Sequence, residues 1–182
     1  MVALIAAALW GFAEATFFFL VPDVILSAIA LYDWRLALLA CLAGVVGALA
    51  GGALMYRQGR RSYRPAQAFL LRLPGIAPPM LTRVREEVTH RRFLAVLTGP
   101  LSGTPYKTYA VEAGRQGLPL AGFLLTTIPA RLMRFVLVTA LAAWLAHSVV
   151  PALPVAWKLA VWAGSWTVFY AWYFAAMRRR AG

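Results

Sequence analysis

The sequence is poor in the residues on which most enzymes and disulfide-rich proteins depend. Its 182 residues include one cysteine, Cys41, two histidines and six acidic residues. A single cysteine excludes an intrachain disulfide framework and a cysteine-based metal site. His90 and His147 lack companion metal ligands, and no Ser/His/Asp, Walker or dinucleotide motif occurs in a suitable context. We therefore expect no metal, no cofactor and no enzyme activity.

Hydrophobic residues, by contrast, are abundant. They make up 62% of the chain, against about 45 to 50% in soluble domains. A helix needs only about 20 apolar residues to cross a hydrocarbon core about 30 Å thick, so the sequence predicts an all-α integral membrane protein. The apolar stretches with few charges are residues 2–32, 36–56, 93–113, 118–147 and 149–177.

The positive charge is concentrated beside these stretches. The formal net charge is +12, with nine arginines in residues 57–92 and three more at 178–180. A basic patch can indicate nucleic-acid binding, but clusters that flank apolar spans follow the positive-inside rule. We therefore expect no nucleic acid, and we place residues 57–92 and the C-terminus on the cytoplasmic side of the membrane. Short amphipathic helices at 66–72 and 80–92 would bind anionic lipid headgroups.

The stretch at 93–113 cannot cross the membrane once. It begins after Arg92 and ends before Arg115, and both arginines belong to the predicted cytoplasmic side. Its middle, from Gly99 to Pro105, reads Gly-Pro-Leu-Ser-Gly-Thr-Pro, which contains too many helix breakers for a continuous helix. The sequence predicts a re-entrant hairpin, enclosed by protein or by a wet cavity.

The first stretch, residues 2–32, is interrupted at Pro22 and is either one long tilted helix or a second hairpin. The spacing favours the hairpin, because Pro22 precedes Arg35 by thirteen positions and Pro105 precedes Leu118 by thirteen. Two hairpin-plus-helix units that enter from opposite faces form an inverted repeat, in which transporters place their binding sites. The first twenty residues lack a basic leading region and a clear cleavage site, so we expect them to remain in the mature protein.

We expect one membrane domain over residues 1–182. It consists of two inverted repeats of a re-entrant hairpin plus a transmembrane helix, followed by a C-terminal transmembrane helix. The expected segments are a first hairpin and helix at 1–56, a basic cytoplasmic amphipathic segment at 57–92, a second hairpin and helix at 93–147, and the last transmembrane helix at 148–177.

Few charged residues fall at membrane depth, and each is informative because a central charge costs about 2.5 to 3.5 kcal/mol on insertion scales. Carboxylates there can load and release protons across a gradient. Arginines there need anionic partners, and the arginine fork suits carboxylate or phosphate. The candidate residues are Glu14, Asp23, Lys107, Glu112, Arg131 and Arg134.

Glu14 and Asp23 are the expected proton-coupling pair. Asp23 also has a structural interpretation, in which it caps the second half-helix after Pro22. Arg131 and Arg134 are three positions apart, so they share one helix face just beyond Pro129.

The two arginines also allow two interpretations. With Lys107 they would form a phosphate site, with Glu112 as a further substrate-binding candidate. In the second interpretation, which is compatible with the first, they form structural ion pairs with the carboxylates of Glu14, Asp23 or Glu112.

Several motifs occur in an order typical of a known family. Over about residues 10–147 this order resembles the DedA family, also called the VTT or SNARE-associated domain. The motifs are Glu14 followed by Leu-Val-Pro-Asp at 20–23, a small-residue helix at 44–56 that runs into Tyr-Arg-Gln-Gly-Arg at 56–60, Gly99-Pro100 to Pro105-Tyr106-Lys107, and Ala113-Gly114.

The resemblance implies two opposed re-entrant hairpins, each packed on a transmembrane helix. It also implies movement of lipids such as polyprenyl phosphate or phospholipid across the bilayer. In bacterial members, acids of the first hairpin and arginines of the second are linked to proton-dependent function. Glu14 and Asp23 match those acids, and Lys107 falls near the second arginine of the family pattern Gly-Arg-Phe-x-Pro-Gly-x-Arg.

The sequence departs from that pattern in two places. Pro100 stands where the first arginine would be, and one residue is inserted before Lys107. The chain therefore resembles a divergent branch of the family, with Arg131 or Arg134 as the candidates to replace the missing charge.

The expected function is that of a lipid-phosphate flippase or scramblase, with proton coupling as a further expectation. Two alternatives remain open at this point: a proton-coupled small-ion or solute antiporter, and a non-transporting membrane scaffold. Glycines in the 44–52 segment permit close helix packing, either within the chain or in a homo-oligomer.

Overall fold

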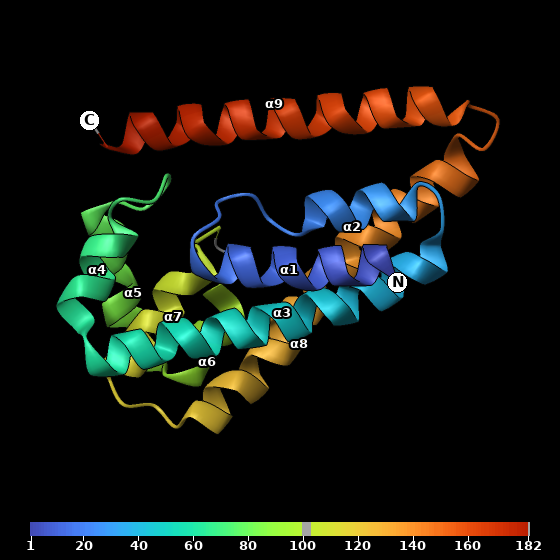
Figure 1. Cartoon of the computed structure of the whole chain (residues 1–182). Coiled ribbons are helices and arrows are strands. Elements are labelled where there is room, and N and C mark those ends of the chain that lie inside the picture. Colours follow the sequence, from blue (N-terminus) through green and yellow to red (C-terminus); the bar gives the residue numbers. More distant parts are fainter. Residues whose placement is uncertain (100–102, 182) are drawn as a thin grey trace.

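The computed structural model in Figure 1 describes residues 1–99 and 103–181, with the backbone alone for 177–181. The described residues form helices and no strand, so the all-helical fold is confirmed. The elements are α1 (Val2–Thr16), α2 (Asp23–Ala30), α3 (Trp34–Arg61), α4 (Tyr63–Leu70), α5 (Pro78–Arg91), α6 (Phe93–Thr98), α7 (Tyr106–Arg115), α8 (Leu120–Trp144), a π-helical turn η2 (Leu145–Val149) and α9 (Val155–Ala181).

The long helix α3 is the element on which the two halves of the chain meet. Asp33 caps its start, because its side chain accepts hydrogen bonds from the backbone N–H groups of Arg35 and Leu36 at 2.9 and 3.0 Å. A Cβ atom added at Gly47 would overlap the carbonyl oxygen of Ala8 on α1. The small residues of α3 therefore serve close packing within the chain, where α1 lies directly against α3 (Figure 1).

The N-terminal stretch divides into two helices that run in opposite directions (Figure 1). The helical structure is interrupted between Thr16 and Asp23. The hydroxyl of Thr16 donates hydrogen bonds to the carbonyl oxygens of Phe12 and Ala13. Both carbonyl groups lie in the last turn of α1, and the backbone N–H groups that follow Thr16 also donate to that of Ala13. Pro22 occupies the N-cap position of α2, which starts a new helix.

The predicted second hairpin corresponds to the helices α6 and α7, with residues 99–105 between them. Residues 100–102 lie outside the described residues. Pro100, which stands where the first arginine of the family pattern would be, is one of them. The backbones of α7 and α3 are in close contact, because a Cβ atom at Gly59 would overlap the carbonyl of Val111, and one at Gly114 would overlap that of Tyr56. Helices α1 and α7 thus both pack on α3, whereas α6 packs on α8.

The basic segment forms the two short helices α4 and α5, close to the predicted positions 66–72 and 80–92. Helix α3 extends to Arg61, so the first residues of the 57–92 segment continue that helix. Leu70, Leu81, Val84 and Val88 are buried in the core that α4 and α5 share with α7. The basic segment is therefore attached to the second hairpin by apolar packing.

Two helical runs within the described residues are long and apolar enough to cross a membrane: Trp34–Arg61 and Leu120–Val149. Within the predicted last span, 149–177, the residues from Val155 onward belong to the continuous helix α9, which is not among these two. Its many Trp and Tyr side chains lower its mean hydropathy, and such residues are typical of the membrane–water interface. In Figure 1, α9 runs back along the edge of the other helices, with α2 beside it.

Candidate functional site

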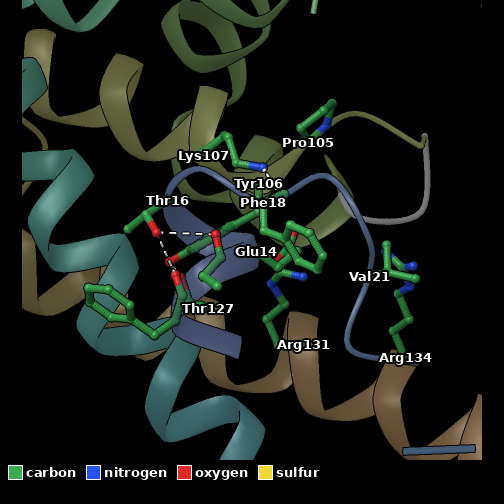
Figure 2. Close-up of polar contacts among 12 residues, drawn as sticks. Glu14, Thr16, Phe18, Val21, Pro105, Tyr106, Lys107, Thr127, Arg131 and Arg134 are labelled. Atoms are coloured by element: carbon green, nitrogen blue, oxygen red, sulfur yellow. Dashed lines mark hydrogen bonds and ion pairs between the residues drawn. The ribbon is translucent and has the colours of Figure 1, made fainter. Parts of the chain in front are cut away.

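The candidate site is a cavity of about 90 Å³ where the two hairpin loops, α8 and α9 meet. Because a single water molecule needs only about 10 to 15 Å³ of such space, the cavity has room for several waters or a small anionic group. Figure 2 shows side chains from α1, α7 and α8 converging there. The residues that carry its charge are Glu14, Lys107, Arg131 and Arg134.

The most deeply buried contact in the site joins Glu14 to Arg131. Nη2 of Arg131 lies 2.6 Å from Oε2 of Glu14, and the two side chains are 1% and 6% exposed. The guanidinium also lies over the ring of Tyr106, 4.4 Å from its centroid, in a favourable cation–π geometry. Among the described residues its Nε atom is buried without a hydrogen-bond partner. The guanidinium also lies 5.8 Å from the ring centroid of Phe135, so one carboxylate and two aromatic rings compensate its charge.

A second pair joins Asp23 to Arg134 one helical turn further along α8. Nη2 of Arg134 lies 2.8 Å from Oδ2 of Asp23, whose side chain is 1% exposed against 25% for Arg134. Within the part of the chain that the structure describes, Oδ1 of Asp23 is buried without a hydrogen-bond partner. The N-cap residue of α2 is Pro22, so Asp23 is the first residue of the helix and not its cap. Its position at the N-terminus of α2 still favours a negative charge.

Lys107 connects the second hairpin to the loop of the first. It is only 3% exposed, and its Nζ donates to the carbonyl oxygen of Phe18 at 2.9 Å. Within the described residues Lys107 forms no salt bridge, so the cluster contains three cations, Lys107, Arg131 and Arg134, and two carboxylates. The cavity wall therefore carries a surplus of positive charge, which favours an anion.

Glu112 lies apart from this cluster. Its Oε1 accepts hydrogen bonds from Arg115 and Gln116 at 2.7 and 2.9 Å, and it lines a smaller cavity with Tyr63 and Leu81 beside α4 and α5. These are local pairs of one helix, three and four positions apart. The structure thus brings together five of the six predicted residues and gives Glu112 a different neighbourhood.

The cavity also has aromatic walls that the sequence analysis missed. The hydroxyl of Tyr106 lies 3.0 Å from that of Thr127, and the hydroxyl of Tyr170 on α9 accepts a hydrogen bond from the backbone N–H of Val21 at 2.9 Å. Tyr106 directly precedes Lys107, which was a usable signal. Nothing local predicts Tyr170, because it lies 149 positions from Val21.

A separate polar cluster holds α5 against α7, away from the cavity. Glu87 accepts hydrogen bonds from Nε of Arg83 at 2.8 Å and from the hydroxyl of Tyr109 at 2.5 Å. Burial by itself would raise the pKa of Glu87, but the hydrogen bonds from Tyr109 and Arg83 outweigh it, so the pKa lies below its usual value. Glu87 is therefore a charged structural contact at neutral pH.

In comparisons with known proteins, the chain matches no family model, no curated protein and no solved structure. The fold and the site nevertheless define a class: an all-helical protein with two candidate membrane-spanning helices and a buried cluster of arginine, lysine and carboxylate groups at the junction of two helix breaks.

Proposed function

We propose that this chain is a multi-pass membrane transporter of the DedA/VTT type that moves phosphate-bearing lipids across the bilayer. The observation that carries the proposal is the surplus of buried positive charge at a cavity formed by two breaks in the helical chain. Placed in a membrane, such a cavity offers an anionic headgroup both a polar environment and a counter-charge.

Exposed apolar side chains support the membrane setting. Leu9 on α1, Val46 on α3, and Leu125 and Leu137 on α8 are between 61% and 66% exposed. Soluble monomers rarely expose contiguous apolar patches of more than a few hundred Å². Lipid contact would remove this surface from water, with α4, α5 and the C-terminal arginines on the cytoplasmic side of an inner membrane.

The lengths of the short helices support re-entrant hairpins. At 1.5 Å per residue, the 15 residues of α1 extend about 22 Å and the 8 residues of α2 about 12 Å. Neither reaches across a hydrocarbon core of about 30 Å, and α6 and α7 are also short. Each hairpin would enter the membrane and return, and the contact of Lys107 with Phe18 joins their loops.

The arrangement of the two ion pairs suggests how a phosphate could bind and leave. Arg134 is the more exposed arginine and faces the cavity, so a phosphate could take the place of the Asp23 carboxylate on its guanidinium fork. The displaced carboxylate would then gain a proton, because an unpaired buried carboxylate is costly. Glu14 and Arg131 would repeat this exchange at the deeper position. Proton uptake and anion binding would thus be coupled.

The decisive experiment measures movement of headgroup-labelled lipid phosphate in liposomes that contain the purified protein, with and without a pH gradient. We expect movement by the wild type, and loss of movement in Arg134→Gln. The matched control is Arg35→Gln, because Arg35 lies on the exposed first turn of α3, and it should retain movement. Dependence on the gradient would identify a flippase, whereas independence would identify a scramblase.

Exchanging the charges of the deeper pair separates transport from scaffolding. The variant Glu14→Arg combined with Arg131→Glu should restore a folded protein without restoring lipid movement, because the proton-accepting group no longer sits on the first hairpin. Equal activity of the exchanged and wild-type proteins would indicate a purely structural pair. Folded wild type that moves no lipid but carries a gradient-driven solute would refute the lipid proposal in favour of an antiporter.

A further inference from the structure

A second and larger cavity, of about 320 Å³, opens as a groove between α2, the end of α8 with η2, and α9. Its walls are largely apolar, and the charged residue that lines it, Lys158, donates through Nζ to the carbonyl oxygens of Ala146 and Pro151 at 2.8 and 3.3 Å. The side chains that line it include Val138, Leu141 and Ala142 of α8, Leu145 of η2, and Val161 and Trp162 of α9.

This groove lies beside the charged cavity on the same two helices. On α8, Arg134 lines the charged cavity and Val138, one turn later, lines the groove. On α9, Tyr170 lines the charged cavity and Trp166, one turn earlier, lines the groove. The two cavities therefore follow one another along α8 and α9, with cations at one end and hydrocarbon side chains at the other.

The polar groups in the groove wall already have partners. The indole N–H groups of Trp162 and Trp166 both reach Oγ of Ser27 on α2, at 2.9 and 3.2 Å. The Oγ of Ser27 in turn donates to the carbonyl oxygen of Asp23 at 2.6 Å. These bonds attach α9 to α2, and they leave the groove with an apolar surface that suits a ligand without polar groups.

The stretch of α8 from Arg134 in the charged cavity to Leu145 in the groove matches one leaflet in length. Leu145 lies eleven positions after Arg134, which corresponds to about 16 Å of helix at 1.5 Å per residue. Half of a hydrocarbon core of about 30 Å is about 15 Å. A lipid whose headgroup lies at Arg134 could therefore extend one chain along the whole groove.

We propose that this groove binds the hydrocarbon chain of the anionic lipid whose phosphate binds beside Arg134, an inference that rests on the proposed function. The substrate is then a single amphiphile held at both ends, rather than a free phosphate or a small ion. Burial of the chain gains little free energy, because the surrounding lipid is as apolar as the groove. The groove acts by alignment: it guides the chain while the headgroup crosses.

Filling the groove tests the proposal. Ala142→Trp places a large ring in the groove, whereas Ala140→Trp puts the same ring on an exposed position of the same helix that does not line it. We expect Ala142→Trp to reduce movement of a long-chain lipid phosphate to the rate of protein-free liposomes. A short-chain analogue with the same headgroup should still move, and Ala140→Trp should move both lipids as the wild type does.

Photo-crosslinking gives an independent reading that does not need transport. A lipid phosphate with a photoreactive group in its chain should label peptides around Ala142 and Val161 in the wild type, with reduced labelling in Ala142→Trp. Labelling confined to the exposed face around Leu125 would refute the groove proposal. If Ala142→Trp transports the long-chain lipid normally while Arg134→Gln does not, the groove proposal fails and the proposed function stands. If the wild type moves no lipid but the groove is labelled, the proposed function is refuted, whereas binding of the hydrocarbon chain in the groove is supported.

Discussion

Removing the carboxylate of Glu14 should destabilise the protein strongly, because it leaves Arg131 charged and without an anionic partner. Both side chains are nearly inaccessible, at 1% and 6% exposure, so solvent cannot take over the lost interaction. Breaking one partner of such a buried pair costs about 3 to 5 kcal/mol. For a chain of this length, that corresponds to a fall in Tm of about 6 to 20 °C.

The assay is thermal unfolding in detergent of wild type, Glu14→Gln and the apolar double variant Glu14→Leu with Arg131→Met. The double variant should recover most of the lost Tm, because a buried pair can be replaced by apolar side chains at little cost. The control is Arg83→Gln, whose side chain is 63% exposed and should change stability by less than about 1 kcal/mol. The reasoning is refuted if Glu14→Gln is as stable as the wild type, or if the double variant is less stable than Glu14→Gln.

Two further predictions concern the packing of α1 on α3 and the cytoplasmic cluster. Gly47→Leu should prevent accumulation of folded protein, because the leucine side chain would overlap the backbone of α1. The control Gly164→Leu should express normally, because the space around its Cβ position is open. Equal yields of the two variants in a size-exclusion assay would contradict this prediction. Because the pKa of Glu87 is lowered in the folded protein, its stabilising contribution is present above its unfolded pKa of about 4.3. That contribution is lost as the pH falls through the pKa of Glu87 in the folded protein. The Tm of wild type should therefore fall more than that of Glu87→Gln between neutral pH and about pH 3. Parallel curves of Tm against pH for the two proteins would contradict this prediction.

The local features of the chain could be predicted from the sequence because each depends on neighbouring residues. Pro22 marks the break between α1 and α2, and the Gly99 to Pro105 stretch marks the break between α6 and α7. The two short basic helices were also predictable, since their apolar positions recur at helical spacing. Mean hydropathy was a less reliable guide to α9 than to the two candidate spans. This apolar stretch is rich in Trp and Tyr, so it forms a long helix without reaching their mean hydropathy.

Glu112 shows the limit of assigning a site from membrane depth alone. The sequence places it only five positions after Lys107, and both residues were candidates for the same site. On a helix, five positions correspond to a rotation of about 140°, so the two side chains face different neighbours. Lys107 reaches Phe18, whereas Glu112 pairs locally with Arg115.

The helical character of the chain, the positions of its helix breaks and the charged residues among apolar ones could all be predicted from the sequence, because these properties depend on composition and on neighbours a few positions away. The pairing of the charges depends on the three-dimensional fold. Glu14 lies 117 positions from Arg131, and Asp23 lies 111 from Arg134. These contacts form because the small residues of α3 let α1 and α8 pack closely against it, and no local pattern encodes the resulting position of α1 and α2 relative to α8.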